Sequence, residues 1–185
     1  MIAFPKPYAD RVARLRAPLG IVLLVLFAWL SRPSVRSLAW GLPVAVAGLL
    51  LRAWATGHLE KDARLAQSGP YAYLRNPLYL GTLLAASGFV IGGRRWELAV
   101  LFAAVFVCVY LPAIMLEEQH LRDLFPEFDA YARRVPALWP TLHPLLASGR
   151  FRPELYRRHR EYQAFVAFVA GVALLVAKVL VPRIP

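Results

Sequence analysis

The stretch SGPYAYLRNPLYLG, residues 68–81, combines turn-forming, aromatic and cationic residues at the entrance of an apolar run. Asn76-Pro77 is typical of a helix start, with Asn as the capping residue and Pro in the first helical position. This pattern predicts that Arg75 lies just outside the helix and that Tyr79 lies in its first turn. We therefore expect a site built where this helix enters a membrane.

The composition favours a membrane protein. Of the 185 residues, 59% are hydrophobic and only 18% are charged, yet the formal net charge is +11 and the mean hydropathy is +0.50. Soluble domains rarely combine these values, so we expect an integral membrane protein with basic loops. The single cysteine, Cys108, excludes a disulfide within the chain, and its apolar neighbours predict a buried packing role.

Apolar runs predict an all-α, polytopic bundle of about five spanning helices with a short cytoplasmic helical segment. A hydrocarbon layer of about 30 Å requires roughly 20 apolar residues per helix. The first run is short and could instead be a signal peptide, although no small-x-small cleavage site follows it. Pro112 in the fourth run predicts a kink. The runs cover residues 15–31, 38–56, 77–93, 97–116 and 162–182.

We expect one membrane domain over residues 1–185. Its motif-bearing core would occupy residues 57–140. Residues 141–185 would add a basic juxtamembrane segment and a further C-terminal helix.

The positions of the basic residues predict the orientation of the bundle. Lys and Arg are enriched in cytoplasmic loops, and residues 117–161 alone contain eight arginines. We therefore expect the N-terminus and the motif loop in the cytoplasm, with a prokaryotic inner membrane as the location. The basic face would attract anionic lipid headgroups. No recognisable nucleic-acid module accompanies the charge, so we do not expect a nucleic-acid partner; the oligomeric state stays open.

Three tyrosines of the motif, Tyr71, Tyr73 and Tyr79, could form an aromatic wall. Such a wall suits a heteroaromatic ring or a sulfonium cation. Each residue taken alone is equally typical of the aromatic and basic anchors of a membrane interface. The set as a whole favours a ligand site.

A second polar cluster begins at Glu117-Glu118, where the fourth apolar run ends. A carboxylate this close to the membrane requires a cation or a donor, and for Glu117 the candidates are Arg52, Arg75 or a cationic ligand. Simple exposure of Glu117 to water is the alternative. Helical spacing predicts that Glu118 and Arg122 form an exposed i,i+4 pair.

Two further patterns predict how the helices pack. A short helix over residues 126–135 presents Phe128, Tyr131 and Val135 as an apolar stripe that can lie on the bundle or on the membrane. Small residues along the third run allow a close neighbour helix. They are Gly81, Ala85, Gly88 and Gly92.

Together these motifs resemble the isoprenylcysteine carboxyl methyltransferase and phospholipid methyltransferase superfamily. The resemblance covers about residues 50–140 and rests on the order of the Gly-Pro-Tyr, Arg-Asn-Pro, Glu-Glu and Val-Pro elements. It implies a helix bundle that binds S-adenosylmethionine at the cytosolic side and methylates a lipophilic acceptor from the bilayer, either a carboxylate or an amine. It implies no metal. Asn76 occupies the position of the family's histidine and cannot titrate; His58 and His120 are the nearby imidazoles.

The resemblance also implies roles for individual residues. Arg75 and Glu117 would be catalytic, with Arg75 holding a carboxylate of cofactor or acceptor and Glu117 meeting the cofactor's positive charge. An amine acceptor would require a general base, for which Glu117 or Glu118 is available. The residues implied in cofactor binding are Gly69, Pro70, Tyr71, Tyr73, Arg75, Asn76, Pro77, Tyr79, Glu117 and Glu118.

Two other classes stay open. One is an NADPH-dependent membrane reductase of sterol or other lipid double bonds, and the other is a non-catalytic membrane scaffold. The Gly-Pro-Tyr and Glu-Glu elements favour methyl transfer, and no Gly-x-Gly-x-x-Gly signature is present, although membrane reductases can lack it. The helix beyond residue 140 departs from the family pattern and could shape substrate entry or an oligomer contact.

Overall fold

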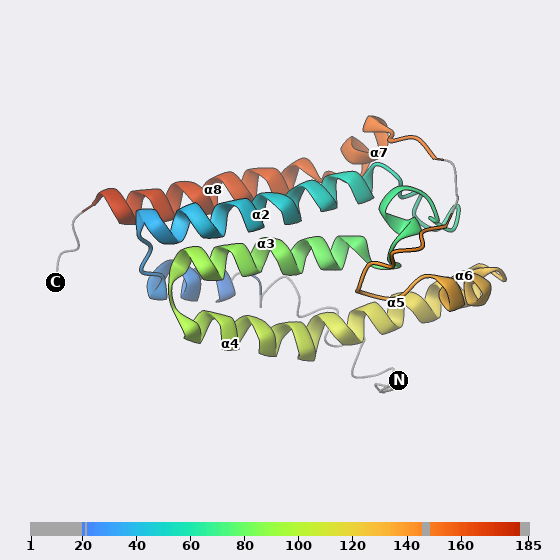
Figure 1. Ribbon diagram of the computed structural model, residues 1–185, viewed down its shortest axis with the longest axis horizontal. Helices are drawn as coiled ribbons and strands as arrows, with labels where there is room; N and C mark the ends of the chain where they lie inside the picture. The colour runs from blue at the N-terminus through green and yellow to red at the C-terminus, as the bar shows by residue number, and fades with distance from the viewer. Residues whose placement is uncertain (1–19, 21, 146–148, 182–185) are drawn as a thin grey trace.

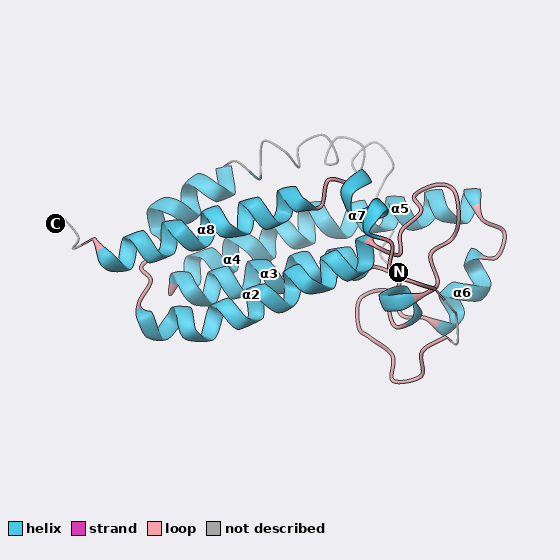
Figure 2. Ribbon diagram, turned by 90° about the horizontal axis from the view of Figure 1, so that it is seen from above, coloured by secondary structure: helices cyan, strands magenta, loops and turns pink. Residues whose placement is uncertain are grey.

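The computed structural model describes residues 20, 22–145 and 149–181, and these form helices and loops without any strand (Figure 2). Helicity follows from the long apolar runs, whose backbone groups can be satisfied within the membrane only by intrahelical hydrogen bonds or by a closed barrel. The all-α prediction is confirmed.

The long helices run side by side along the long axis of the molecule (Figure 1). A helical stretch at residues 22–30 precedes them, and the rest of the first predicted run lies outside the described residues. The helices α2, α4–α5 and α8 are long and apolar enough to cross a membrane, and α3 is a shorter apolar helix. The helices of the bundle are α2 (Val35–Thr56), α3 (Pro77–Gly93), α4 (Trp96–Val105), η2 (Phe106–Tyr110), α5 (Leu111–Leu124) and α8 (Tyr162–Leu180).

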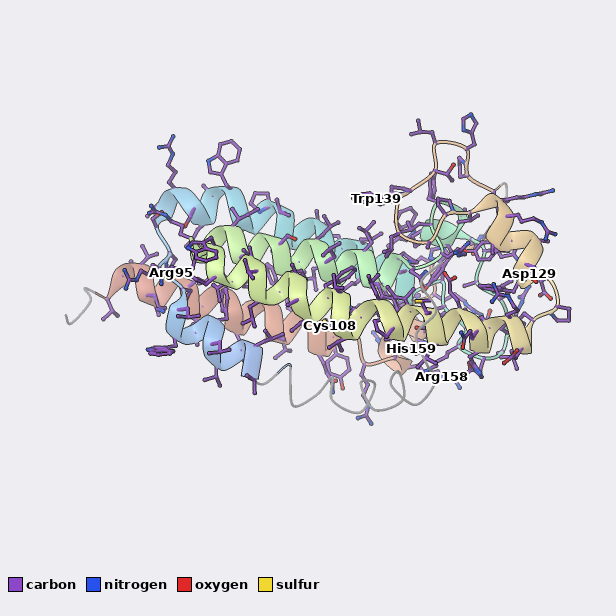
Figure 3. All side chains as sticks on the ribbon, turned by 90° about the horizontal axis from the view of Figure 1, so that it is seen from below. Arg95, Cys108, Asp129, Trp139, Arg158 and His159 are labelled. Carbon is purple, nitrogen blue, oxygen red and sulfur yellow. The ribbon has the colours of Figure 1, made fainter. Side chains whose placement is uncertain are left out.

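The fourth predicted run becomes one continuous helix that extends to Leu124, beyond the apolar residues. Its middle segment, η2, is π-helical and ends two residues before Pro112. Because proline provides no amide hydrogen, a widened turn absorbs the irregularity that the sequence predicted as a kink. Cys108 lies in η2 and is exposed on the bundle surface (Figure 3), so the prediction of a buried packing role is wrong.

The α2 and α3 helices approach until their backbones touch. A Cβ atom on Gly48 would lie 2.5 Å from the carbonyl oxygen of Gly81, and one on Gly88 would lie 2.5 Å from that of Gly41. Contacts this close leave no space for a side chain. The prediction that small residues of the third run allow a close neighbour helix is confirmed.

The shorter elements gather where α5 ends (Figure 1). They are the 3₁₀ turn η1 (Gly69–Ala72), α6 (Phe128–Arg134) and α7 (Pro153–Arg158). The apolar stripe Phe128, Tyr131 and Val135 is buried there as one cluster. The Tyr131 hydroxyl donates a hydrogen bond to the carbonyl oxygen of Tyr71 at 2.7 Å. The stripe therefore packs on the motif loop.

Candidate functional site

Two adjoining cavities lie at the end of the bundle that carries the motif loop. The outer cavity, of about 390 Å³, is bounded by residues 59–66, α5 and α6. The inner cavity, of about 370 Å³, lies among α2, α3 and the α4–α5 helix. Four predicted site residues line both cavities and form the boundary between them. They are Tyr71, Arg75, Asn76 and Glu117.

The Arg75 guanidinium is held by the protein itself. Its Nε and Nη2 donate to the two carboxylate oxygens of Glu118 at 2.9 and 3.0 Å. Its Nη1 donates to the carbonyl oxygens of Ala132 and Val135 at 2.8 and 3.0 Å. Arg75 thereby anchors α5 and the end of α6 to the motif loop, and four hydrogen bonds occupy four of its five N–H donors.

Glu118 is buried, and the predicted exposed pair with Arg122 is therefore wrong. Arg122 instead donates to Asp129 at 2.8 Å on the surface. The two residues lie on the same side of α5, but Glu118 meets Arg75, whereas Arg122, one turn further along, meets Asp129 and the Phe128 ring. A bidentate bond to Arg75 compensates the buried carboxylate, which an exposed partner could not do.

Asn76 precedes the helix that begins at Pro77, as predicted, but its side chain makes no capping bond. Its amide Nδ2 donates to Glu118 at 2.9 Å and to the carbonyl oxygen of Ala137 at 3.2 Å. The buried carboxylate of Glu118 requires hydrogen-bond donors. Leaving it without them would cost more free energy than leaving the first backbone amides of α3 without a side-chain cap. Asn76 thus completes the Arg75–Glu118 network.

The three motif tyrosines do not form a common wall. Tyr71 is buried and lines both cavities, and Tyr79 lines the inner one. Tyr73 lines neither cavity; it is 39% exposed and lies beside Trp54, with ring centroids 6.5 Å apart. The 3₁₀ helix η1 explains this. It has about three residues per turn, so the side chains of Tyr71 and Tyr73, two residues apart, point to different sides. Tyr110, which the sequence reasoning missed, instead packs edge-on against Tyr79 at 6.1 Å.

Glu117 is exposed and is the carboxylate that the two cavities share. It accepts a hydrogen bond from the Tyr79 hydroxyl at 2.9 Å and forms no ion pair within the described residues. The expected partner Arg52 instead binds Glu161, which α8 brings to within 2.7 Å. The other expected partner, Arg75, is engaged by Glu118. Glu117 therefore faces both cavities, and its carboxylate has no ion-pair partner among the described residues.

Burial governs the ionisation of the two phenols at the site. It raises the pKa of Tyr71, and the nearby negative charge of Glu117 raises it further. Burial also raises the pKa of Tyr131, although the positive charge of Arg75 acts in the opposite direction. Both phenols stay protonated at neutral pH. Both therefore offer neutral aromatic surface to the cavities, and Tyr131 also donates its hydroxyl hydrogen to the carbonyl oxygen of Tyr71.

Of the two imidazoles named from the sequence, one lines the outer cavity, and several further lining residues escaped the sequence reasoning. His120 lines the cavity and contacts Asp62 at 3.2 Å, whereas His58 lines neither of the two cavities. The loop that carries Asp62 has no local motif, so its position depends on tertiary contacts. The remaining predicted residues lie nearby: Pro77 lines the inner cavity, while Gly69, which has a φ of 59°, and Pro70 shape the loop. The missed lining residues include Lys61, Asp62, Arg64, Leu116 and Phe128.

Comparison with known families identifies the kind of protein that carries these cavities. The sequence model of the phospholipid methyltransferase family matches residues 15–127, which include all four residues shared by the two cavities. The chain belongs to the phospholipid methyltransferase family. This family assignment confirms the resemblance deduced from the motifs, and it implies a membrane methyltransferase.

Two curated relatives of this family member are named for metal resistance. The nickel-cobalt-cadmium resistance protein NccN of Alcaligenes xylosoxydans xylosoxydans is 31% identical over 157 residues, which cover 76% of this chain and 72% of NccN. The cobalt-zinc-cadmium resistance protein CzcN of Cupriavidus metallidurans is 38% identical over 106 residues, which cover 55% of this chain and 47% of CzcN. No solved structure matches.

Proposed function

We propose that this chain is an integral membrane, S-adenosylmethionine-dependent methyltransferase that acts on a lipophilic acceptor, a carboxylate or an amine, from the bilayer. The observation that carries the proposal is the pair of cavities that meet at Glu117. Within a methyltransferase family, two chambers with one shared boundary suit a donor and an acceptor that must meet at one point.

The outer cavity suits the cofactor in size and chemistry. Its volume of about 390 Å³ is typical of small-molecule sites. Tyr71 and Phe128 offer aromatic surface for an adenine ring, Glu117 offers a carboxylate for a positive charge, and Lys61 and Arg64 offer cations for a carboxylate. When bound, S-adenosylmethionine supplies an electrophilic methyl group on a positively charged sulfur.

The inner cavity suits an acceptor with an apolar tail. It shares Thr82 and Tyr110 with a third cavity of about 280 Å³. Apolar side chains from residues 23–27, α3, α4 and α8 line this third cavity. A polar reacting group could therefore lie near Glu117 while its hydrocarbon chain occupies the apolar space. This arrangement supports an acceptor that enters from the bilayer.

Glu117 has a separate role for each kind of acceptor. Among the described residues, it is the only acid that lines the inner cavity. An amine must lose a proton during methylation, and the Glu117 carboxylate is placed to accept it while the Tyr79 hydroxyl orients its second oxygen. A carboxylate acceptor requires no base near neutral pH, so Glu117 would then serve only the cofactor's positive charge.

Binding of S-adenosylmethionine to the detergent-purified protein, measured by calorimetry with NADPH as the paired control, tests the proposal. We expect the wild-type protein to bind S-adenosylmethionine and not NADPH. Glu117→Gln should weaken this binding about tenfold or more, since a hydrogen bond to a charged group contributes about 1.5–3 kcal/mol. Glu154→Gln, an exposed change on α7 outside both cavities, is the matched control.

Each alternative class has its own result in this measurement. Binding of NADPH alone would contradict the proposal and favour a membrane reductase. Binding of neither ligand would favour a scaffold. If binding is as expected, transfer of a radiolabelled methyl group from S-adenosylmethionine into a membrane lipid extract will identify the acceptor. Glu117→Gln should abolish transfer to an amine, which requires the base, and should reduce transfer to a carboxylate at cofactor concentrations below saturation.

The names of the relatives suggest a physiological setting. We place the reaction in metal resistance, through methylation of a membrane constituent. Cells that express the wild-type chain should then tolerate more cobalt or nickel than cells that express Glu117→Gln at equal abundance. Equal metal tolerance would show that the methyl transfer has no role in metal resistance, and it would leave the result of the binding experiment unchanged.

A further inference from the structure

A basic cavity lies at the opposite end of the bundle from the candidate site. Its volume is about 600 Å³, and it opens between residues 32–35, the turn from α3 to α4 and the end of α8. The residues described as lining it include four cations and no acid. The cations are Arg32, Arg94, Arg95 and Lys178, and the other lining residues are Pro33, Ser34, Val35, Val179 and Val181.

Hydrogen bonds join the segments that carry these cations. The Arg32 backbone amide donates to the carbonyl oxygen of Gly93 at 2.7 Å, which ties the residues before α2 to the end of α3. The ammonium of Lys178 on α8 donates to the carbonyl oxygens of Ala28 and Ser31 at 2.6 and 2.7 Å and to the Ser31 hydroxyl at 3.2 Å. Three segments of the chain therefore meet around the cavity, and because protein acceptors occupy the donors of Lys178, the three arginines are the cations that a ligand would contact.

Two features of the cavity wall point to a bound anion. Arg94 ends α3 with φ 53° and ψ 39°, a left-handed conformation that costs a non-glycine residue on the order of 1 kcal/mol or more. Glycine would avoid this cost, but it would remove a cation from the cavity. The second feature is Arg95 (Figure 3), whose buried Nε has no hydrogen-bond partner. Such donors are rare, and an anionic oxygen would satisfy this one.

The ion-pair partner of Arg95 does not line the cavity. Arg95 Nη2 bonds Glu97 Oε1 at 2.9 Å, and Glu97 is not among the residues described as lining the cavity. Arg95 is therefore the member of this pair that a ligand in the cavity can reach, and an oxygen of a phosphodiester would accept a hydrogen bond from it.

Exposed tryptophans place this end of the bundle at a membrane surface. Trp29, Trp40 and Trp96 are 78%, 71% and 73% exposed. Trp96 begins α4 close to the cavity, and Val35 and Val181 on the cavity wall are also exposed. Tryptophan is enriched at the depth of lipid headgroups. Cations beside apolar side chains at that depth match a headgroup together with the start of its acyl chains.

We infer that this cavity binds the phosphodiester headgroup of an anionic phospholipid in the leaflet opposite the candidate methyl-transfer site. The inference is independent of the proposed function, because none of the cavity residues lines the outer or inner cavity.

Native mass spectrometry of the full-length protein with dioleoylphosphatidylglycerol tests the inference, with dioleoylphosphatidylcholine and inorganic phosphate as comparisons. We expect phosphatidylglycerol to bind about tenfold or more tightly than phosphatidylcholine. Arg94→Gly should weaken binding about fivefold, the contribution of one arginine near a membrane surface. It should leave the melting temperature equal or higher, because glycine relieves the left-handed strain. Arg36→Gln is the matched control, since Arg36 is exposed at the same end but does not line the cavity.

Three results would overturn the inference. Equal weakening by Arg94→Gly and Arg36→Gln would indicate attraction by diffuse surface charge. Inorganic phosphate that binds as tightly as phosphatidylglycerol, with the same dependence on Arg94, would indicate a site for a soluble anion. Equal binding of phosphatidylglycerol and phosphatidylcholine would exclude selection by the arginines.

Discussion

Replacement of Arg75 by alanine distinguishes a structural anchor from a ligand contact. The motif alone predicts that this change abolishes cofactor binding and leaves the fold intact. The structure predicts a loss of stability, because the Arg75 and Glu118 side chains are only 7% and 11% exposed and bind each other in bidentate fashion. Arg75 also satisfies the carbonyl oxygens of Ala132 and Val135.

The magnitude follows from the burial of this pair. Removal of one partner leaves an uncompensated buried charge, which costs about 3–5 kcal/mol. For chains of this length 1 kcal/mol corresponds to about 2–4 °C, so the melting temperature should fall by roughly 6–20 °C. Glu118→Ala should have a similar effect, and the double variant should lose less than the sum of the two. Glu117→Ala should melt like the wild type, since Glu117 is exposed and accepts one hydrogen bond from Tyr79.

Thermal unfolding of the detergent-purified variants, followed by intrinsic tryptophan fluorescence, measures these differences, and calorimetry on the same samples measures S-adenosylmethionine binding. The structural reasoning would be refuted if Arg75→Ala melted within about 2 °C of the wild type and still failed to bind. Arg75 would then be a direct ligand contact, and Glu118 would be stable in the interior without it.

Three further predictions concern packing, ionisation and the link between α2 and α8. Gly48→Ala should force α2 and α3 apart and cost about 1–3 kcal/mol in thermal unfolding, whereas Gly20→Ala, which meets no atom within 4 Å, should have little effect. Folding raises the pKa of the Tyr71 and Tyr131 phenols, so these groups should leave stability unchanged below about pH 10 and reduce it at higher pH; a spectrophotometric titration should show two tyrosines that ionise after the others. Glu161→Gln should lower the melting temperature by weakening the bond to Arg52, and an unchanged value would show that this pair contributes little.

Local patterns predicted the helices and which of them are apolar enough to span a membrane. A long apolar run specifies a spanning helix wherever it lies in the sequence, and Asn76-Pro77 specifies a helix start through its own backbone. The small residues of the third run likewise indicated a close helix contact, although not that α2 would provide it. The motif order was sufficient to reveal the family, because it records short segments and their spacing.

The partners of the charged residues were beyond reach of the sequence. Glu117 and Glu118 are neighbours in the chain, yet a rotation of about 100° around the α5 axis directs one to the cavities and the other to Arg75. Arg52 meets Glu161 across 109 residues because α8 returns beside α2. The sequence by itself therefore determined the helical membrane architecture and the motif residues that gather at one end, since hydropathy and turn chemistry act locally. Only the tertiary structure decided which carboxylate stabilises the fold and which faces a ligand, because that choice depends on how distant helices are rotated against each other.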